Sequence, residues 1–237
     1  MFPLGNRPMV IITSSSGLTE SAHGGTAPRS YEAPVTEVTR LSEVLIQMSM
    51  SLDGFIAGPH DSDVDRLHEW MFGATGGVPG EGLTGVDKEI FDDLRKTGAM
   101  ISGRRLYDIT HGWDGSHPLG LIPVFVVTHD VPDHVPAGTT RFTFITDGIA
   151  SAVAQAKAAA GDKNVYVVGG ASIDQQLLNA CLVDELRIDV VPILLGSGIR
   201  LFAELRNAPI ELQQMKVTSS KGVTHLRYRV AGPHQRR

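Results

Sequence analysis

The sequence predicts an α/β fold with a largely parallel central sheet and an antiparallel hairpin at its C-terminal end. Between residues 99 and 191, short apolar runs alternate with segments of helical periodicity. This alternation is typical of βαβ units, in which a helix returns the chain so that the next strand runs parallel to the last. Residues 211–219 and 223–230 are two further strand-like runs around a turn that contains Gly222, and they predict the closing hairpin.

Each element of the domain is predicted from a local pattern. Short apolar runs predict strands, one-sided apolar periodicity predicts helices, and Gly or Pro marks the turns. In the first half these patterns give, in order, a strand over 44–51, a turn at Asp53-Gly54, a short helix over 63–71, a flexible glycine-rich segment over 76–80, and a helix over 84–96 that is capped by Thr84 and ended by Gly98. In the second half they give strands over 99–102, 124–128, 142–145, 165–168 and 185–191, and helices that begin near Gly103, span 149–160 and span 172–180. Asp147 is expected to cap the helix over 149–160 and Gly161 to end it, and the strand over 185–191 has period two.

One domain, residues 44–232, is expected between two tails. Residues 1–43 are rich in Ser, Thr, Gly, Pro and Ala without a sustained period, which predicts a disordered, mobile tail. A docking segment and an over-extended start codon are the alternatives for it. Residues 233–237 form a second, short tail. A domain of this length buries about 70% of its unfolded surface, so it needs no disulfide or metal to fold.

Composition and charge exclude several classes of function. The chain of 237 residues has a formal net charge of −5, whereas a nucleic-acid-binding face is basic. No apolar run approaches the roughly 20 residues of a membrane span or forms a signal peptide, so a cytoplasmic protein is expected, without membrane or nucleic-acid partners. The single cysteine, Cys181, is expected to be an ordinary buried thiol. The histidines, for example His111 and His117, lack metal-ligand spacing, so no metal site is predicted.

A buried strand followed by two glycines is the strongest functional signal. Residues 165–168 lead into Gly169 and Gly170, and Ala171 and Ser172 begin the next helix. Such a junction directs free backbone N–H groups outward, and glycine lets a diphosphate approach the backbone closely. A tight turn without any ligand explains the same residues, so both interpretations stay open. The motif is not the G-x-G-x-x-G fingerprint of an ordinary dinucleotide-binding fold.

A second junction has the same organisation and adds positive charge. Gly103 ends a strand, and Arg104 and Arg105 open the next helix. Arginine in a first helical turn opposes the helix dipole, a cost that is easier to explain if the guanidinium groups bind an anion. Solvent-facing arginines that tolerate this cost are the alternative.

The ends of the parallel strands should bring these junctions together. In open α/β folds ligands bind at the carboxyl edge of the sheet, and two phosphate-binding sites there suit a dinucleotide with a separate ribose phosphate. Thr128 and His129 end a third strand at this edge, and they either contact the adenine or ribose or form an ordinary loop. Asp53 follows the first strand, where its carboxylate would orient a substrate amine or relay a proton, or would only form the Asp-Gly turn.

The segments 50–57, 103–107 and 167–171 occur in an order and spacing that resemble the dihydrofolate reductase-like superfamily. The closest resemblance is to the C-terminal reductase domain of the bifunctional riboflavin-biosynthesis deaminase/reductase, and it covers about residues 44–230. It implies the three-layer fold of that superfamily, a homodimer, and NADPH as hydride donor. The site residues that it implies are Asp53 facing the substrate, Ile56 and Ala57 beside the nicotinamide, Gly103, Arg104 and Arg105 at phosphates, with Arg104 at the ribose 2′-phosphate, and Gly169, Gly170, Ala171 and Ser172 at the diphosphate.

The sequence therefore predicts an NADPH-dependent reductase of a small pyrimidine- or pterin-like heterocycle, similar to a 5-amino-6-(5-phosphoribosylamino)uracil reductase of riboflavin biosynthesis. The alternatives are a non-catalytic NADP(H)-binding protein, a dihydrofolate reductase, and a partner-binding dimer that uses its C-terminal hairpin. Dihydrofolate is disfavoured because the Trp-Pro loop and the helical carboxylate of dihydrofolate reductases have no clear counterpart. The zinc ligands of the deaminase domain are also absent from the sequence.

Overall fold

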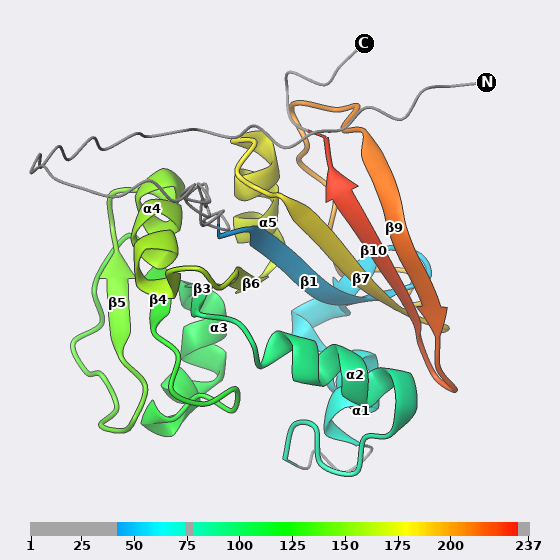
Figure 1. Ribbon diagram of the computed structural model, residues 1–237, viewed down its shortest axis with the longest axis horizontal. Coiled ribbons are helices and arrows are strands. Elements are labelled where there is room, and N and C mark those ends of the chain that lie inside the picture. Colours follow the sequence, from blue (N-terminus) through cyan, green and yellow to red (C-terminus); the bar gives the residue numbers. More distant parts are fainter. Residues whose placement is uncertain (1–41, 74–77, 232–237) are drawn as a thin grey trace, which may run out of the picture. The chain divides into compact units, whose positions relative to one another are not determined.

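An eight-stranded sheet forms the centre of the domain, with the strand order β5-β4-β3-β6-β1-β7-β10-β9 (Figure 1). The computed structural model describes residues 42–73 and 78–231. Nearly all of the two predicted tails and part of the predicted flexible segment 76–80 lie outside these described residues. The strands of the central sheet are β1 (Val44–Ser51), β3 (Ala99–Gly103), β4 (Val124–Val127), β5 (Phe142–Ile145), β6 (Val165–Gly169), β7 (Glu185–Val191), β9 (Leu212–Ser219) and β10 (Thr224–Val230).

Parallel pairing dominates this sheet. From β5 through β4, β3, β6 and β1 to β7, each strand pairs in parallel with the next. Strand β10 pairs antiparallel with both β7 and β9. This arrangement confirms the predicted mostly parallel sheet with an antiparallel C-terminal hairpin.

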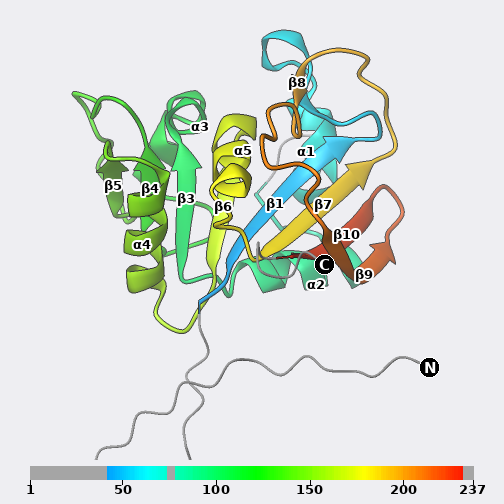
Figure 2. The same cartoon turned by 90° about the horizontal axis from the view of Figure 1, so that it is seen from above.

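Helices cover both faces of the sheet, which gives the domain three layers (Figure 2). Successive residues of β1 point into two different cores: Ile46 packs in the core that contains α4 and α5, whereas Leu45 packs with Leu94 of α2 and Tyr107 of α3. Burial on both faces explains why the central strands are apolar without alternation. The helices are α1 (Val64–Phe72), α2 (Gly85–Leu94), α3 (Arg104–Ile109), α4 (Ile149–Ala160) and α5 (Ala171–Asn179).

The helix ends differ in part from the predicted caps. The N-cap of α4 is Gly148, not Asp147, because the chain enters this helix with a φ of 102°, which glycine adopts without strain. Gly161 ends α4 as predicted. Thr84 is the N-cap of α2, but its side chain makes no capping hydrogen bond.

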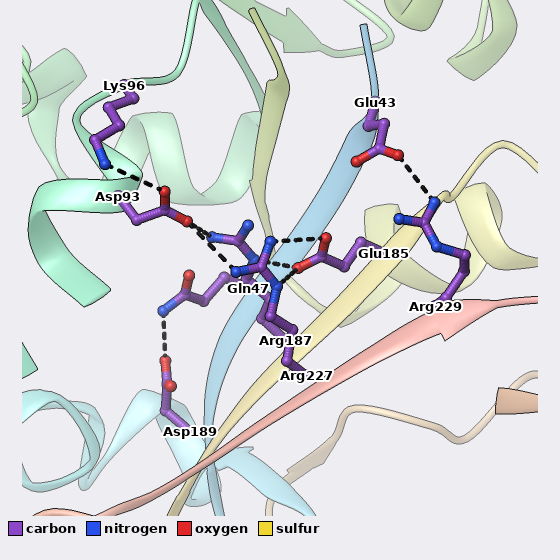
Figure 3. A network of polar contacts seen from close by, with 9 residues as sticks. All are labelled: Glu43, Gln47, Asp93, Lys96, Glu185, Arg187, Asp189, Arg227 and Arg229. Carbon is purple, nitrogen blue, oxygen red and sulfur yellow. Dashed lines mark hydrogen bonds and ion pairs between the residues drawn. The ribbon is translucent and has the colours of Figure 1, made fainter. Parts of the chain in front are cut away.

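Strand β7 is the clearest departure from its sequence pattern. A period of two is typical of a half-buried strand, yet Glu185, Arg187 and Asp189 are only 0%, 7% and 2% exposed. These side chains are paired beneath α2, as Figure 3 shows. Arg187 donates hydrogen bonds to Glu185 at 2.6 Å and to Asp93 of α2 at 2.8 Å, and Asp189 accepts one from Gln47 at 2.9 Å. Buried charges are tolerated here because each has a partner.

The prediction that Cys181 is buried is wrong. Cys181 is exposed, because it follows α5 in a turn with a φ of 56° and so lies beyond the packed face of that helix. Within residues 42–73 and 78–231, no helix has the length and apolar character needed to cross a membrane.

The substitution Arg187→Leu is expected to lower the free energy of unfolding by about 1.5–3 kcal/mol, because it removes one of the two arginines that bind the fully buried Glu185 and leaves only Arg227. Urea denaturation measures this loss. The control is Lys88→Ala, which breaks an exposed pair with Asp92 and should cost less than about 1 kcal/mol. Equal losses in the two variants would contradict a stabilising role for the buried network.

Candidate functional site

A cleft of about 1000 Å³ opens over the carboxyl ends of β3, β4 and β6. It brings the two predicted glycine junctions together, as the parallel sheet requires. Asp53, the predicted catalytic residue, does not line the cleft. The predicted cofactor-binding residues all line it: Ile56, Ala57, Gly103, Arg104, Arg105, Thr128, His129, Gly169, Gly170, Ala171 and Ser172.

Two glycines at the end of β6 shape one side of this cleft. A Cβ atom on Gly169 would lie 2.2 Å from Oδ1 of Asp174, so a larger residue there would have to displace the buried Asp174 carboxyl group. Gly170 has a φ of 86°, and no atom outside its immediate chain neighbours lies within 4 Å of where its Cβ would be. The backbone that leads into α5 is therefore open on the cleft side, as close approach of a phosphate requires.

Acidic and carbonyl partners hold both arginines of α3 at the cleft. Arg104 donates to Oδ1 of Asp108 at 2.8 Å and to the carbonyl of Asp130 at 2.7 Å. Arg105 forms an ion pair with Asp61. These partners account for arginine in a first helical turn without an anion, and an anionic ligand would compete with them for the guanidinium groups.

The loop after β4 contributes the buried hydroxyl of Thr128 and the exposed ring of His129 to the cleft. The hydroxyl of Thr128 donates to the carbonyl of Asp130 at 2.8 Å, which closes the turn after β4. The Nη1 atom of Arg104 lies 3.5 Å from the same hydroxyl oxygen. His129 is exposed at the cleft surface.

The carboxylate of Asp53 closes the loop after β1 and does not face the cleft. It accepts hydrogen bonds from the Ser51 hydroxyl at 2.6 Å and from the backbone N–H groups of Leu195 at 3.1 Å and Gly196 at 2.7 Å. The Ser51 bond first, and then the two N–H groups, lower the pKa of Asp53 to about 2 against the opposing effect of burial. This geometry favours the turn-forming interpretation of Asp53, and its catalytic role stays a prediction.

A second sheet, which the sequence did not predict, supports Ile56 and Ala57. Strand β2 (Phe55–Ala57) pairs with β8 (Ile199–Arg200), and the 3-10 helix η1 (Pro59–Asp61) follows β2. A Cβ atom on Gly198 would lie 2.0 Å from the carbonyl oxygen of Ala57, so the two segments meet because residue 198 is glycine. Strands of two and three residues are too short to give a periodic pattern, although the glycine at position 198 could have indicated a close backbone contact.

Sequence reasoning also missed a buried acid behind the glycine junction. Asp174 of α5 is fully buried, and neither of its carboxyl oxygens has a hydrogen-bond partner in the described part of the chain. Burial raises the pKa of Asp174 well above its ordinary value, so the neutral acid is favoured. An aspartate in a first helical turn ordinarily faces solvent, and therefore nothing local predicts this position.

Helices α1 and α3 also supply lining residues that sequence reasoning missed. Val64, Asp65 and His68 of α1 and Leu106 and Ile109 of α3 line it. These residues reach the cleft because of the position in which each helix packs on the sheet, and no local sequence pattern predicts that position. Across the ranges 42–73 and 78–231, no group of three or more His, Cys, Asp or Glu residues is arranged to hold a metal ion.

Comparison with known families agrees with this geometry. The family model described as the RibD C-terminal domain matches residues 42–226. The chain belongs to this family. One relative is the uncharacterized protein YwjB of Bacillus subtilis (strain 168), which is 31% identical over 171 residues, an alignment that covers 70% of this chain and 85% of YwjB.

Solved structures show that this chain has the dihydrofolate reductase-like fold. A putative riboflavin biosynthesis protein from Shewanella sp. PV-4 is similar with a TM-score of 0.62 and 25% identity, over 80% of this chain and 99% of that one. The dihydrofolate reductase of Enterococcus faecalis, solved as a complex with NADP(H), is similar with a TM-score of 0.52 and 14% identity, over 81% and 98% of the two chains. The second likeness shows the fold alone. The predicted resemblance to the reductase domain of the riboflavin-biosynthesis enzyme and the predicted fold class are therefore confirmed.

The substitution Asp53→Asn is expected to lower the melting temperature at pH 7 but to have little effect near pH 2. A carboxyl group whose pKa is lowered on folding, here from 3.8 to about 2, contributes stability above pH 3.8 that is lost as the pH falls through 2. Thermal unfolding of both proteins between pH 2 and pH 7 measures the difference. A difference that is constant across this range would contradict the stabilising role of the ionised group.

The opposite pH dependence is expected for Asp174. Because folding raises its pKa above 3.8, the wild-type protein loses up to about 1.4 kcal/mol of stability per pH unit from pH 3.8 up to the raised pKa. Asp174→Asn removes this loss, so the variant gains stability relative to wild type as the pH rises. Urea denaturation at pH 4 and pH 8 tests this, and parallel pH profiles would disprove it.

Proposed function

We propose that this protein is an NADPH-dependent reductase of a small pyrimidine- or pterin-like heterocycle, such as 5-amino-6-(5-phosphoribosylamino)uracil. One observation carries the proposal: all the residues predicted to bind the cofactor, from separate parts of the sequence, line one cleft of about 1000 Å³. Small-molecule and cofactor pockets have volumes of about 300–1000 Å³, so this cleft is large enough for a dinucleotide beside a small ring. Membership in the RibD C-terminal domain family supports a riboflavin-type reductase.

The lining residues fit a phosphorylated dinucleotide at two places. The open backbone at Gly169 and Gly170, with Ser172 beside it, would hold the diphosphate. Arg104 and Arg105 would exchange their carboxylate partners for the ribose 2′-phosphate, which carries more charge and accepts bidentate hydrogen bonds. When bound, NADPH would supply the hydride.

Apolar residues would line the cleft around the nicotinamide and the substrate ring. Ile56 and Ala57 of β2 and Leu106 and Ile109 of α3 line the cleft with apolar side chains. Such walls exclude water and strengthen the few polar contacts that orient a substrate. The chain would thus act by positioning the reacting groups.

A non-catalytic NADP(H)-binding protein is the second candidate, and the geometry of Asp53 favours it. This carboxylate is held in the loop by Ser51, Leu195 and Gly196, so the acid predicted to act on the substrate is not at the cleft. The loss of NADPH absorbance on mixing with 5-amino-6-(5-phosphoribosylamino)uracil tests the two candidates. Turnover rules out the second candidate, whereas NADPH binding without oxidation by this compound, a pterin or a quinone supports it.

The substitution Arg104→Ala is expected to raise the Kd for NADPH about 10-fold or more, because a charge-assisted hydrogen bond contributes about 1.5–3 kcal/mol. The Kd for NADH should change little, since NADH lacks the 2′-phosphate. Isothermal titration of both nucleotides measures this selectivity. Arg141→Ala, an exposed arginine that does not line the cleft, is the control. An equal loss of NADPH and NADH binding in Arg104→Ala would contradict the assignment.

A further inference from the structure

His68 belongs to α1, and residues before and after it in this helix make contacts that fix the position of the helix. Leu67 is fully buried and packs with Val191 and Val223. The indole N–H of Trp70 donates to the hydroxyl of Ser49 on β1 at 2.9 Å. These contacts tie α1 to the sheet, and His68 lines the cleft. Its ring is therefore held in place before any ligand binds.

One ring nitrogen of His68 is committed to the helix. Nδ1 lies 2.9 Å from the carbonyl oxygen of Val64, one turn earlier in α1. A carbonyl oxygen can only accept, so Nδ1 carries the hydrogen, and in a neutral imidazole Nε2 then bears the lone pair. Among the described residues, no hydrogen bond engages Nε2, although the ring is only partly exposed. His68 thus presents an acceptor without a protein partner.

The charge state of this ring follows from its surroundings. Burial lowers the pKa of His68 below 6.5, more strongly than the carbonyl of Val64 and the carboxylates of Asp189 on β7 and Asp65 on α1 raise it. The neutral ring is therefore the main form at pH 7. Below its pKa the ring becomes a donor at both nitrogens and can no longer accept.

The carboxylates of Asp61 and Asp63 at the cleft already have partners. Asp61 pairs with Arg105, and Asp63 accepts a hydrogen bond from Ser62 and pairs with Arg66. Asp65 and Asp130 also line the cleft without a carboxylate partner in the described part of the chain, but both residues are exposed, so water satisfies their oxygens. His68 differs from them because it combines partial burial, a fixed tautomer and an unused nitrogen.

We propose that Nε2 of His68 accepts a hydrogen bond from an N–H or O–H group of the substrate and so determines which heterocycles bind. The identity of the ligand as substrate rests on the proposed function. A ring amide or an exocyclic amine, as in an aminouracil, supplies such a donor. An analogue with only acceptors on that edge leaves Nε2 unpaired in the cleft and is rejected, since an unpaired buried polar group costs more than a neutral contact.

A steady-state experiment tests this role through its pH profile. With NADPH and 5-amino-6-(5-phosphoribosylamino)uracil, the KM of the wild type should rise up to 10-fold per pH unit as the pH falls below the pKa of His68. His68→Gln keeps an acceptor that does not titrate, so its KM at pH 8 should stay within about fivefold of wild type and its profile should flatten. His68→Leu should raise KM at least 10-fold at pH 8. The exposed His134→Gln is the control and should match wild type. An unchanged pH profile in His68→Gln would overturn the proposal.

A measurement on the ring itself separates this inference from the proposed function. Nitrogen NMR of the full chain with ring-labelled histidine, assigned by comparison with His68→Gln, reports the tautomer and the titration of His68 without substrate. A neutral ring at pH 7 with hydrogen on Nδ1 is expected. Hydrogen on Nε2, or a ring that is charged at pH 7, would overturn the proposal whether or not the protein oxidises NADPH. Absence of NADPH oxidation with the expected ring state would instead count against the proposed function.

Discussion

Parallel pairing of β1 with both β6 and β7 is the constraint on which the rest of the structure depends. Parallel strands cannot be joined by a tight turn, so the chain must cross back over the sheet, and the crossing helices cover both faces. Parallel pairing of β3 with β6 and β4 extends this arrangement and directs the carboxyl ends of the three strands to one edge, where the cleft lies. Residues that follow different strands thereby become neighbours although they are far apart in the sequence.

Local sequence patterns were enough to predict most of the fold. The parallel topology then predicted that residues at the ends of different strands meet in part of the site. Apolar runs, a period of two and the hairpin turn together predicted every strand of the central sheet, and the rule that parallel ends meet grouped Gly169 with Gly103, which both line the cleft. Features that depend on distant partners were not predictable in this way. The burial of Asp189 depends on Gln47 and His225, which bond to its carboxylate from β1 and β10. No pattern within β7 contains that information.

Asp53 and His68 show the same limit at single residues. Asp53 was favoured because it follows the end of β1, but the N–H groups of Leu195 and Gly196, which belong to a segment much later in the chain, turn its carboxylate into the loop. His68 lies in a short helix without a recognisable motif, and it reaches the cleft because Leu67 and Trp70 dock that helix on the sheet. The chemistry of a side chain is readable from sequence, whereas its neighbours are fixed by long-range packing.

The central position of β1 also sets the order in which this protein can assemble. Val44 pairs with Val165, and its backbone N–H group donates a hydrogen bond to the side chain of Asp184. The first strand of the domain therefore cannot form its native pairs until segments that leave the ribosome much later have been synthesised. Such long-range pairing is slow, and an unpaired apolar strand is prone to aggregation in the meantime. Because Ala57 and Gly198 must also meet, the wall of the cleft closes only after most of the chain has been synthesised. A truncated chain that ends before β7 would therefore contain both glycine junctions but would not form the complete cleft.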